Sequence, residues 1–164
     1  MLKRFMNRAD EEQGFTLIEL MVVVLIIGIL IAIALPTFLG ARSRAQNRAA
    51  QSSLRNALVA AKTSYTDNND YSGADNAGLT AIEPSLSYLD TGNSTGPNVV
   101  SVTPFDVNGT ADAWSGAALS ASGTCYWIMD ESTTPGAGTF YGSDPTGAAC
   151  AGADAQAAAS PAFP

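Results

Sequence analysis

The chain has 164 residues, a length that accommodates one small domain and a long helix but not two full domains. It contains no histidine, which removes the commonest general base and the commonest metal ligand in proteins. Residues 63–164 carry eleven acidic side chains and no Lys or Arg, so this part is not expected to bind the phosphate backbone of nucleic acids directly.

The first 14 residues, MLKRFMNRADEEQG, form a short charged segment ahead of a long apolar one. An ordinary secretory signal has a shorter apolar stretch that is followed by a cleavage site with small residues. Here the apolar stretch is longer, and the residue pair that looks cleavable, Gly14-Phe15, precedes it. Cleavage there would remove a leader peptide of residues 1–14 and keep the apolar helix in the mature protein.

Residues 15–35 are almost wholly apolar, with Thr16 and Glu19 as their strongly polar members. At about 1.5 Å per residue, a helix of this length spans about 30 Å, enough to cross a bilayer. Residues 15–36 are therefore expected to form a transmembrane and filament-core helix. The positive-inside rule does not favour a cytoplasmic N-terminus, because four arginines follow the segment within about twenty residues. The size of the C-terminal part and its two cysteines nevertheless favour placing that part outside the cytoplasm.

Glu19 needs an explanation, because a carboxylate within an apolar span is costly to insert into a membrane. It could lie near the interface and extend its side chain to water. Alternatively, it pairs with a cation. Phe15 lies four residues earlier on the same helix face, and cleavage after Gly14 would give Phe15 a charged α-amino group. That amine could pair with Glu19 of a neighbouring helix shifted along the axis by about 6 Å or more.

Residues 14–38, GFTLIELMVVVLIIGILIAIALPTF, resemble the N-terminus of type IV pilins and of their relatives, the type II secretion pseudopilins. In that family a prepilin peptidase cuts after the glycine and methylates the new N-terminal phenylalanine. The resemblance therefore implies that Gly14 is recognised, that Phe15 becomes N-methylated, and that Glu19 acts in assembly. It also implies a cytoplasmic N-terminus before assembly.

Gly28 and Pro36 are expected to weaken the helix that follows the cleavage site. Pro36 has no N–H, so the carbonyl of Ala32 loses its helical partner and a kink is expected there. Gly28 lies two turns earlier and lowers the helix propensity further. The resemblance implies that the segment between these two residues can lose helicity within a filament.

The helical pattern continues over residues 37–65, where the apolar stripe changes phase. The first stripe is expected to pack between subunits, and the second, roughly 150° away, on the protein's own sheet. A single irregular amphipathic helix is the alternative. The first stripe contains Phe38, Ala41, Ala45 and Ala49, and the second contains Ala50, Leu54, Leu58, Ala61 and Tyr65.

Residues 66–164 are expected to form a globular β head, which makes the fold class α+β. Residues 66–73, TDNNDYSG, should end the helix, and they lack the oxygen ligands of a calcium loop. Residues 74–97 have the composition of a loop. Four strand patterns then predict an antiparallel meander packed on the helix, at residues 98–105, 113–121, 124–129 and 139–141. The last fifteen residues, mostly small, are predicted to be a poorly ordered, flexible tail.

Cys125 and Cys150 are the only cysteines, and both follow the apolar segment. This fits a disulfide formed in an oxidising compartment, and the alternative is two reduced cysteines in a cytosolic protein. A bond would close a loop of about 25 residues, which stabilises the folded chain by ~3.5 kcal/mol in the chain-entropy model. The bond also matches the C-terminal disulfide loop of many type IV pilins.

The sequence therefore favours a structural subunit of a type IV pilus, made as a prepilin in the cytoplasmic membrane and found later in an extracellular pilus. The implied partners are a prepilin peptidase and methylase, identical subunits in a helical homopolymer, an inner-membrane assembly platform, and membrane lipid before assembly. A type II secretion pseudopilin or a minor pilin is the alternative. Residues 144–147, Asp-Pro-Thr-Gly, lack the tryptophan of the calcium-loop signature of the major pseudopilin. An enzyme anchored by one helix is not supported, and neither a cofactor nor a metal is expected.

Overall fold

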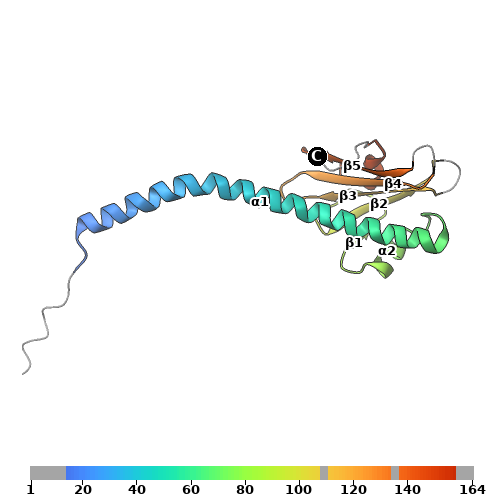
Figure 1. Ribbon diagram of the computed structural model, residues 1–164, viewed down its shortest axis with the longest axis horizontal. Helices are drawn as coiled ribbons and strands as arrows, with labels where there is room; N and C mark the ends of the chain where they lie inside the picture. The colour runs from blue at the N-terminus through green and yellow to red at the C-terminus, as the bar shows by residue number, and fades with distance from the viewer. Residues whose placement is uncertain (1–13, 108–110, 134–136, 158–164) are drawn as a thin grey trace, which may run out of the picture. The chain divides into compact units, whose positions relative to one another are not determined.

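The computed structural model describes residues 14–107, 111–133 and 137–157 (Figure 1). The chain divides into two compact units, Met1–Ala41 and Arg42–Pro164. The helices and strands confirm the α+β class, with a long N-terminal helix and one five-stranded sheet. In chain order they are α1 (Leu17–Asn68), α2 (Asn76–Ile82), β1 (Ser87–Leu89), β2 (Val99–Phe105), β3 (Ala113–Leu119), β4 (Cys125–Glu131), β5 (Gly138–Asp144) and the 3-10 helix η1 (Gly152–Ala157).

The first unit contains the start of α1. Every described side chain up to Leu39 is exposed, so this segment has no core of its own. The helix continues through Gly28 and Pro36, and the Thr37 hydroxyl donates to the carbonyl of Ala34 at 2.8 Å. The expected kink and the expected loss of helicity in a filament therefore stay predictions.

In the second unit, α1 presents the predicted second stripe to the sheet. Its Ala and Leu members are buried, and Tyr65 packs against the same core. The Ala residues of the first stripe are exposed, and Phe38, in the other unit, is also exposed, so the packing of that stripe between subunits stays a prediction. α1 ends at Asn68, within the predicted stop segment and three residues after the predicted end. Asn69 follows with φ of 59°, a left-handed conformation that asparagine tolerates at a helix C-terminus.

The sheet has the strand order β1-β2-β3-β4-β5, and the predicted antiparallel meander is β2 to β5. Pro104 lies in the part of β2 beyond the pairing with β1, so its missing N–H removes no ladder bond on that side. The last strand, β5, is longer than predicted.

The prediction of loop for residues 74–97 is wrong in two places, because they contain α2 and β1. Asp75 caps α2 by accepting a hydrogen bond from the N–H of Gly78 at 2.8 Å. β1 has three residues and pairs in parallel with β2, which places Ser87 opposite Val99. A strand this short has too few residues for the alternation of side chains to become visible in the sequence.

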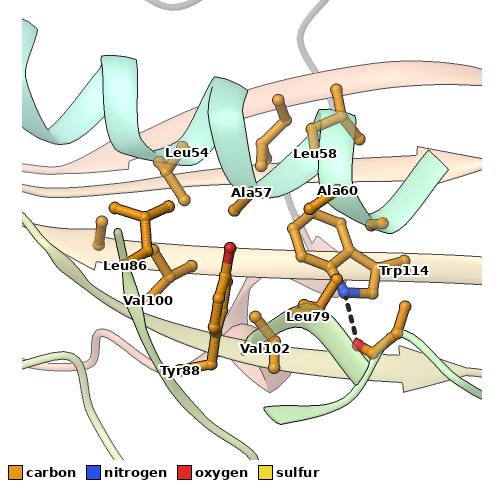
Figure 2. Close-up of a cluster of buried hydrophobic side chains, with 14 of the residues drawn as sticks. Leu54, Ala57, Leu58, Ala60, Leu79, Leu86, Tyr88, Val100, Val102 and Trp114 are labelled. Carbon is orange, nitrogen blue, oxygen red and sulfur yellow. Dashed lines mark hydrogen bonds between the residues drawn. The ribbon is translucent and has the colours of Figure 1, made fainter. Parts of the chain in front are cut away.

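Alternate residues of the strands point to two different layers. One face packs on α1, and its core contains Val100, Val102, Trp114, Ala118, Tyr126 and Ile128. Figure 2 shows Val100, Val102 and Trp114 beneath α1. Trp114 donates its indole N–H to the carbonyl of Ala74 at 3.1 Å. On the other face η1 contacts β2, β3 and β4, and the Ser115 hydroxyl donates to the carbonyl of Gly152 at 2.7 Å. Within the predicted flexible tail, Gly152–Ala157 form η1, while residues 158–164 lie outside the described residues.

Candidate functional site

The predicted processing and assembly residues lie together at the start of α1. Gly14, Phe15, Thr16 and Glu19 line one surface hollow, and 87% of Phe15 is exposed. Residues 1–13 of the predicted leader lie outside the described residues. The structure therefore brings the predicted cleavage pair and the predicted assembly glutamate into one small region.

Thr16 and Glu19 form a reciprocal set of hydrogen bonds at the N-terminus of α1. The backbone N–H and the hydroxyl of Thr16 donate to Glu19 Oε2, at 2.9 and 2.6 Å. In return, the N–H of Glu19 donates to Thr16 Oγ1 at 3.3 Å. This is a capping box, which satisfies backbone N–H groups that have no partner within the helix. This role of Thr16 was not predicted, although the Thr-x-x-Glu spacing at residues 16–19 is the signature of a capping box.

The capping box uses one of the two oxygens of the Glu19 carboxylate and leaves the other able to accept a hydrogen bond. Only Oε2 accepts from Thr16, and Oε1 makes no hydrogen bond within the described residues. A carboxylate can accept at both oxygens, so Glu19 can cap its own helix and bind a further donor. Cleavage after Gly14 would leave the box intact, because the amide between Phe15 and Thr16 is retained.

The helix that follows the capping box presents apolar side chains on all sides. Among the described residues, α1 is the one helix with an apolar stretch long enough to span a bilayer. The large hydrophobic side chains from Phe15 to Leu39 are each at least 48% exposed. An apolar surface of this extent is typical of segments that insert into a membrane or pack against other chains.

The head contains the predicted disulfide. Cys125 and Cys150 are bonded, with 5.5 Å between their Cα atoms, and both are buried. The bond joins the start of β4 to the segment that precedes η1, and its surroundings include Ala117 and Leu119. The disulfide therefore holds the C-terminal segment against the sheet.

The turn at residues 144–147 satisfies its own carboxylate. Asp144 accepts from the N–H and the hydroxyl of Thr146, both at 2.8 Å to Oδ1, and these bonds hold the pKa of Asp144 below its usual value. Within the described part of the chain, no group of three or more His, Cys, Asp or Glu side chains is arranged to hold a metal ion.

A buried acid connects α1 to the sheet. Asp130 is 5% exposed, and its carboxylate lies 2.9 Å from Lys62 Nζ. It also accepts hydrogen bonds from the hydroxyls of Tyr71 and Thr139, each at 2.5 Å. Burial and this contact raise the pKa of Tyr71. The set joins three elements and has the form of a structural contact that fixes the helix on the sheet.

Comparison with known proteins gives a family match in the N-terminal segment and several similar curated proteins. Residues 11–35 match the family described as "Prokaryotic N-terminal methylation motif". The chain is 45% identical over 60 residues to "Type IV major pilin protein PilA" of Myxococcus xanthus, which covers 37% of this chain and 27% of that protein. It is 39% identical to "Type IV major alpha-pilin" of Moraxella bovis, over 46% of this chain and 52% of that protein.

A third relative comes from a secretion system. The chain is 35% identical over 77 residues to "Type II secretion system core protein G" of Escherichia coli, which covers 47% of this chain and 52% of that protein. The chain thus spans about half or less of the length of these curated relatives. No solved structure matches the chain. Three findings together support a type IV pilin-family protein. They are the methylation motif, the similarities to pilins and to core protein G, and the architecture of one long helix with a mostly antiparallel sheet.

Proposed function

We propose that the chain is a structural subunit of a type IV pilus, made as a prepilin, cleaved after Gly14 and N-methylated at Phe15. The subunit then polymerises through its apolar helix with identical copies. The observation that carries this proposal is the exposed apolar part of α1, which begins at a capping box next to the predicted cleavage pair. Such a surface requires a bilayer before assembly and other helices after it.

In this proposal Glu19 has two simultaneous contacts. Its Oε2 atom stays in the capping box with Thr16, and its Oε1 atom accepts from the Phe15 amine of a neighbouring subunit. Methylation leaves that amine charged, and an apolar surrounding strengthens the attraction between the two charges. The pairing therefore selects one axial register, which apolar contacts alone specify poorly.

The proposed life cycle begins in the cytoplasmic membrane, with the N-terminus inside. The prepilin peptidase and methylase acts there, and an inner-membrane assembly platform then adds the subunit to an extracellular pilus. The similarity to type IV major pilins of two organisms supports the step in which the subunit joins a pilus. The disulfide is consistent with a head that folds outside the cytoplasm.

A pseudopilin of a type II secretion system is the second candidate, because the chain is also similar to core protein G of such a system. The two functions differ in what a deletion removes. Loss of a pilin removes long surface filaments, while loss of a pseudopilin blocks the release of secreted proteins.

Two matched variants separate the cap from the charge in cells that assemble the wild-type chain. Glu19→Gln keeps an acceptor for the capping box and removes the charge, while Thr16→Val removes the hydroxyl and keeps the charge. Both should insert into the membrane and be processed to a methylated Phe15 terminus, as mass spectrometry would show. Glu19→Gln should give few or no sheared filaments, while Thr16→Val should still assemble. Wild-type filament numbers from Glu19→Gln would contradict the pairing, and filaments that retain Met1 would contradict the processing.

A further inference from the structure

Positive and negative charges occupy different parts of the chain. After Gly14 the sequence has five basic residues, and all of them lie on α1. Eleven of the twelve acidic residues that follow Gly14 lie beyond Lys62, in the head. Lys62 contacts Asp130, and the other four bases are exposed arginines between residues 42 and 55.

Three of these arginines form one stripe on the exposed side of α1. Arg44, Arg48 and Arg55 fall within about 40° of one another at 100° per residue. The centre of the buried face lies roughly 140° away around the helix. All three arginines are exposed, and the guanidinium groups of Arg44 and Arg48 make no ion pair or hydrogen bond within the described residues. We call these three residues the arginine stripe.

Acidic residues gather at the end of the head where α1 ends. The strand register places Phe105, Ala113, Glu131 and Gly138 in one row across the sheet. The contact between Lys62 and Asp130 fixes this row beside the last turns of α1. The side chains of Asp67 and Glu131 make no hydrogen bond or ion pair within the described part of the chain. We call the following residues the acidic end: Asp67, Asp70, Asp106 and Glu131.

We propose that the arginine stripe of one subunit binds the acidic end of a second copy of the chain. The inference rests on the proposed function, because it describes a contact within the homopolymer. Heads that carry eleven acids and no base beyond Lys62 repel one another, and the arginines of α1 are the exposed side chains of the mature chain that can offset this repulsion. Two different surfaces meet in this contact, so each copy keeps a free surface of each kind and the contact can propagate along a helical filament.

The proposal also specifies an axial offset between the copies in contact. Arg48 and Asp67 are nineteen residues apart on the same helix, which corresponds to about 28 Å at 1.5 Å per residue. Within one copy they are therefore too far apart for an ion pair. Copies that contact each other through these surfaces should be displaced along α1 by roughly this distance.

Zero-length crosslinking of assembled filaments tests the contact directly. A water-soluble carbodiimide condenses an amine and a carboxylate in direct contact into an amide, while the reagent itself becomes a urea. Removal of residues 1–14 takes away Lys3 and leaves Lys62 as the one lysine in the sequence. The contact between Lys62 and Asp130 serves as an internal control for the reaction. In filaments of Arg48→Lys, we expect new amides between the side chain at position 48 and carboxylates of the acidic end. Such an amide must join two copies, because these positions are too far apart within one copy. Arg42→Lys is the matched control, since position 42 lies about 160° around the helix from Arg44.

Charge reversal provides the second measurement. Arg44→Glu/Arg48→Glu should strongly reduce filament number while processed subunit stays at its normal level, and adding Asp67→Lys/Glu131→Lys should restore filaments. The proposal is overturned if the Lys62–Asp130 amide forms without any link from position 48 to the acidic end. It is also overturned if the charge reversal lowers membrane levels of the subunit and the head substitutions do not rescue it, which would indicate binding to anionic lipid headgroups. Absence of filaments from the wild-type chain would instead contradict the proposed function.

Discussion

The double substitution Cys125→Ala/Cys150→Ala removes the bond that holds the C-terminal segment against the sheet. The two cysteines are separated by 25 residues in the sequence. In the chain-entropy model, closing a loop of this length stabilises the folded state by ~3.5 kcal/mol at 25 °C. Loss of the two buried sulfur atoms adds a smaller packing cost. For a head of this size, the Tm should fall by roughly 10–15 °C.

Near-ultraviolet circular dichroism of the full chain in detergent measures this change, because Trp114 and Tyr71 are fully buried reporters of head packing. Wild-type protein that has been unfolded, reduced and refolded in reductant should melt like the double variant. Native wild-type protein should react with reductant slowly, since both cysteines are at most 1% exposed. A decrease in Tm of less than about 3 °C would refute the reasoning, because the bond would then contribute under about 1 kcal/mol.

Two further predictions concern buried polar groups of the head. Burial, with a contribution from Glu83, raises the pKa of Tyr88 from 10.0 to about 12. Its pKa is higher in the folded state, so this tyrosine contributes stability that is lost as the pH rises from about 10 to about 12. The Tyr88 hydroxyl points toward α1 (Figure 2) and makes no hydrogen bond within the described residues, so Tyr88→Phe should leave stability near neutral pH unchanged or up to about 1 kcal/mol higher. The same variant should lose less stability in alkali, and alkaline melts identical to wild type would contradict this. Asp130→Ala should cost about 1–3 kcal/mol in urea titrations by removing the acceptor of the buried Tyr71 hydroxyl, and Tyr71→Phe/Asp130→Ala should recover part of that loss. Strictly additive losses would show that the two groups are not coupled.

The sequence predicted those parts of the fold whose pattern repeats over many residues. The apolar stripe from Ala50 to Tyr65 repeats over four turns, and it correctly identified the face of α1 that packs on the sheet. β2, β3 and β4 each have seven residues between recognisable turns, so their positions were predictable. α2, β1 and η1 were missed, because each is short and is held by contacts with distant residues, such as that between Ser115 and Gly152.

The residues of the candidate site were proposed from the resemblance to pilins, and their contacts were predictable only in part. That resemblance implied roles for Gly14, Phe15 and Glu19, which the structure places together, and the roles themselves stay predictions. The role of Thr16 was readable from its spacing to Glu19, since a capping box depends on local sequence alone. The contact between Tyr71 and Asp130 was not predictable, because 59 residues separate the two side chains and no local pattern records their meeting.

The two units of the chain obtain their stability in different ways. In the head, burial is completed by folding, since α1, α2 and the sheet enclose residues such as Trp114 and Ile128. In residues 14–39 no described side chain is buried, so the free energy of apolar burial is gained there only from lipid or from other chains. A membrane offers Glu19 no cation of fixed position, whereas a processed neighbouring subunit would bring its own N-terminal amine. Transfer from lipid to a filament would therefore exchange one apolar environment for another, and the polar contacts would decide its direction and register.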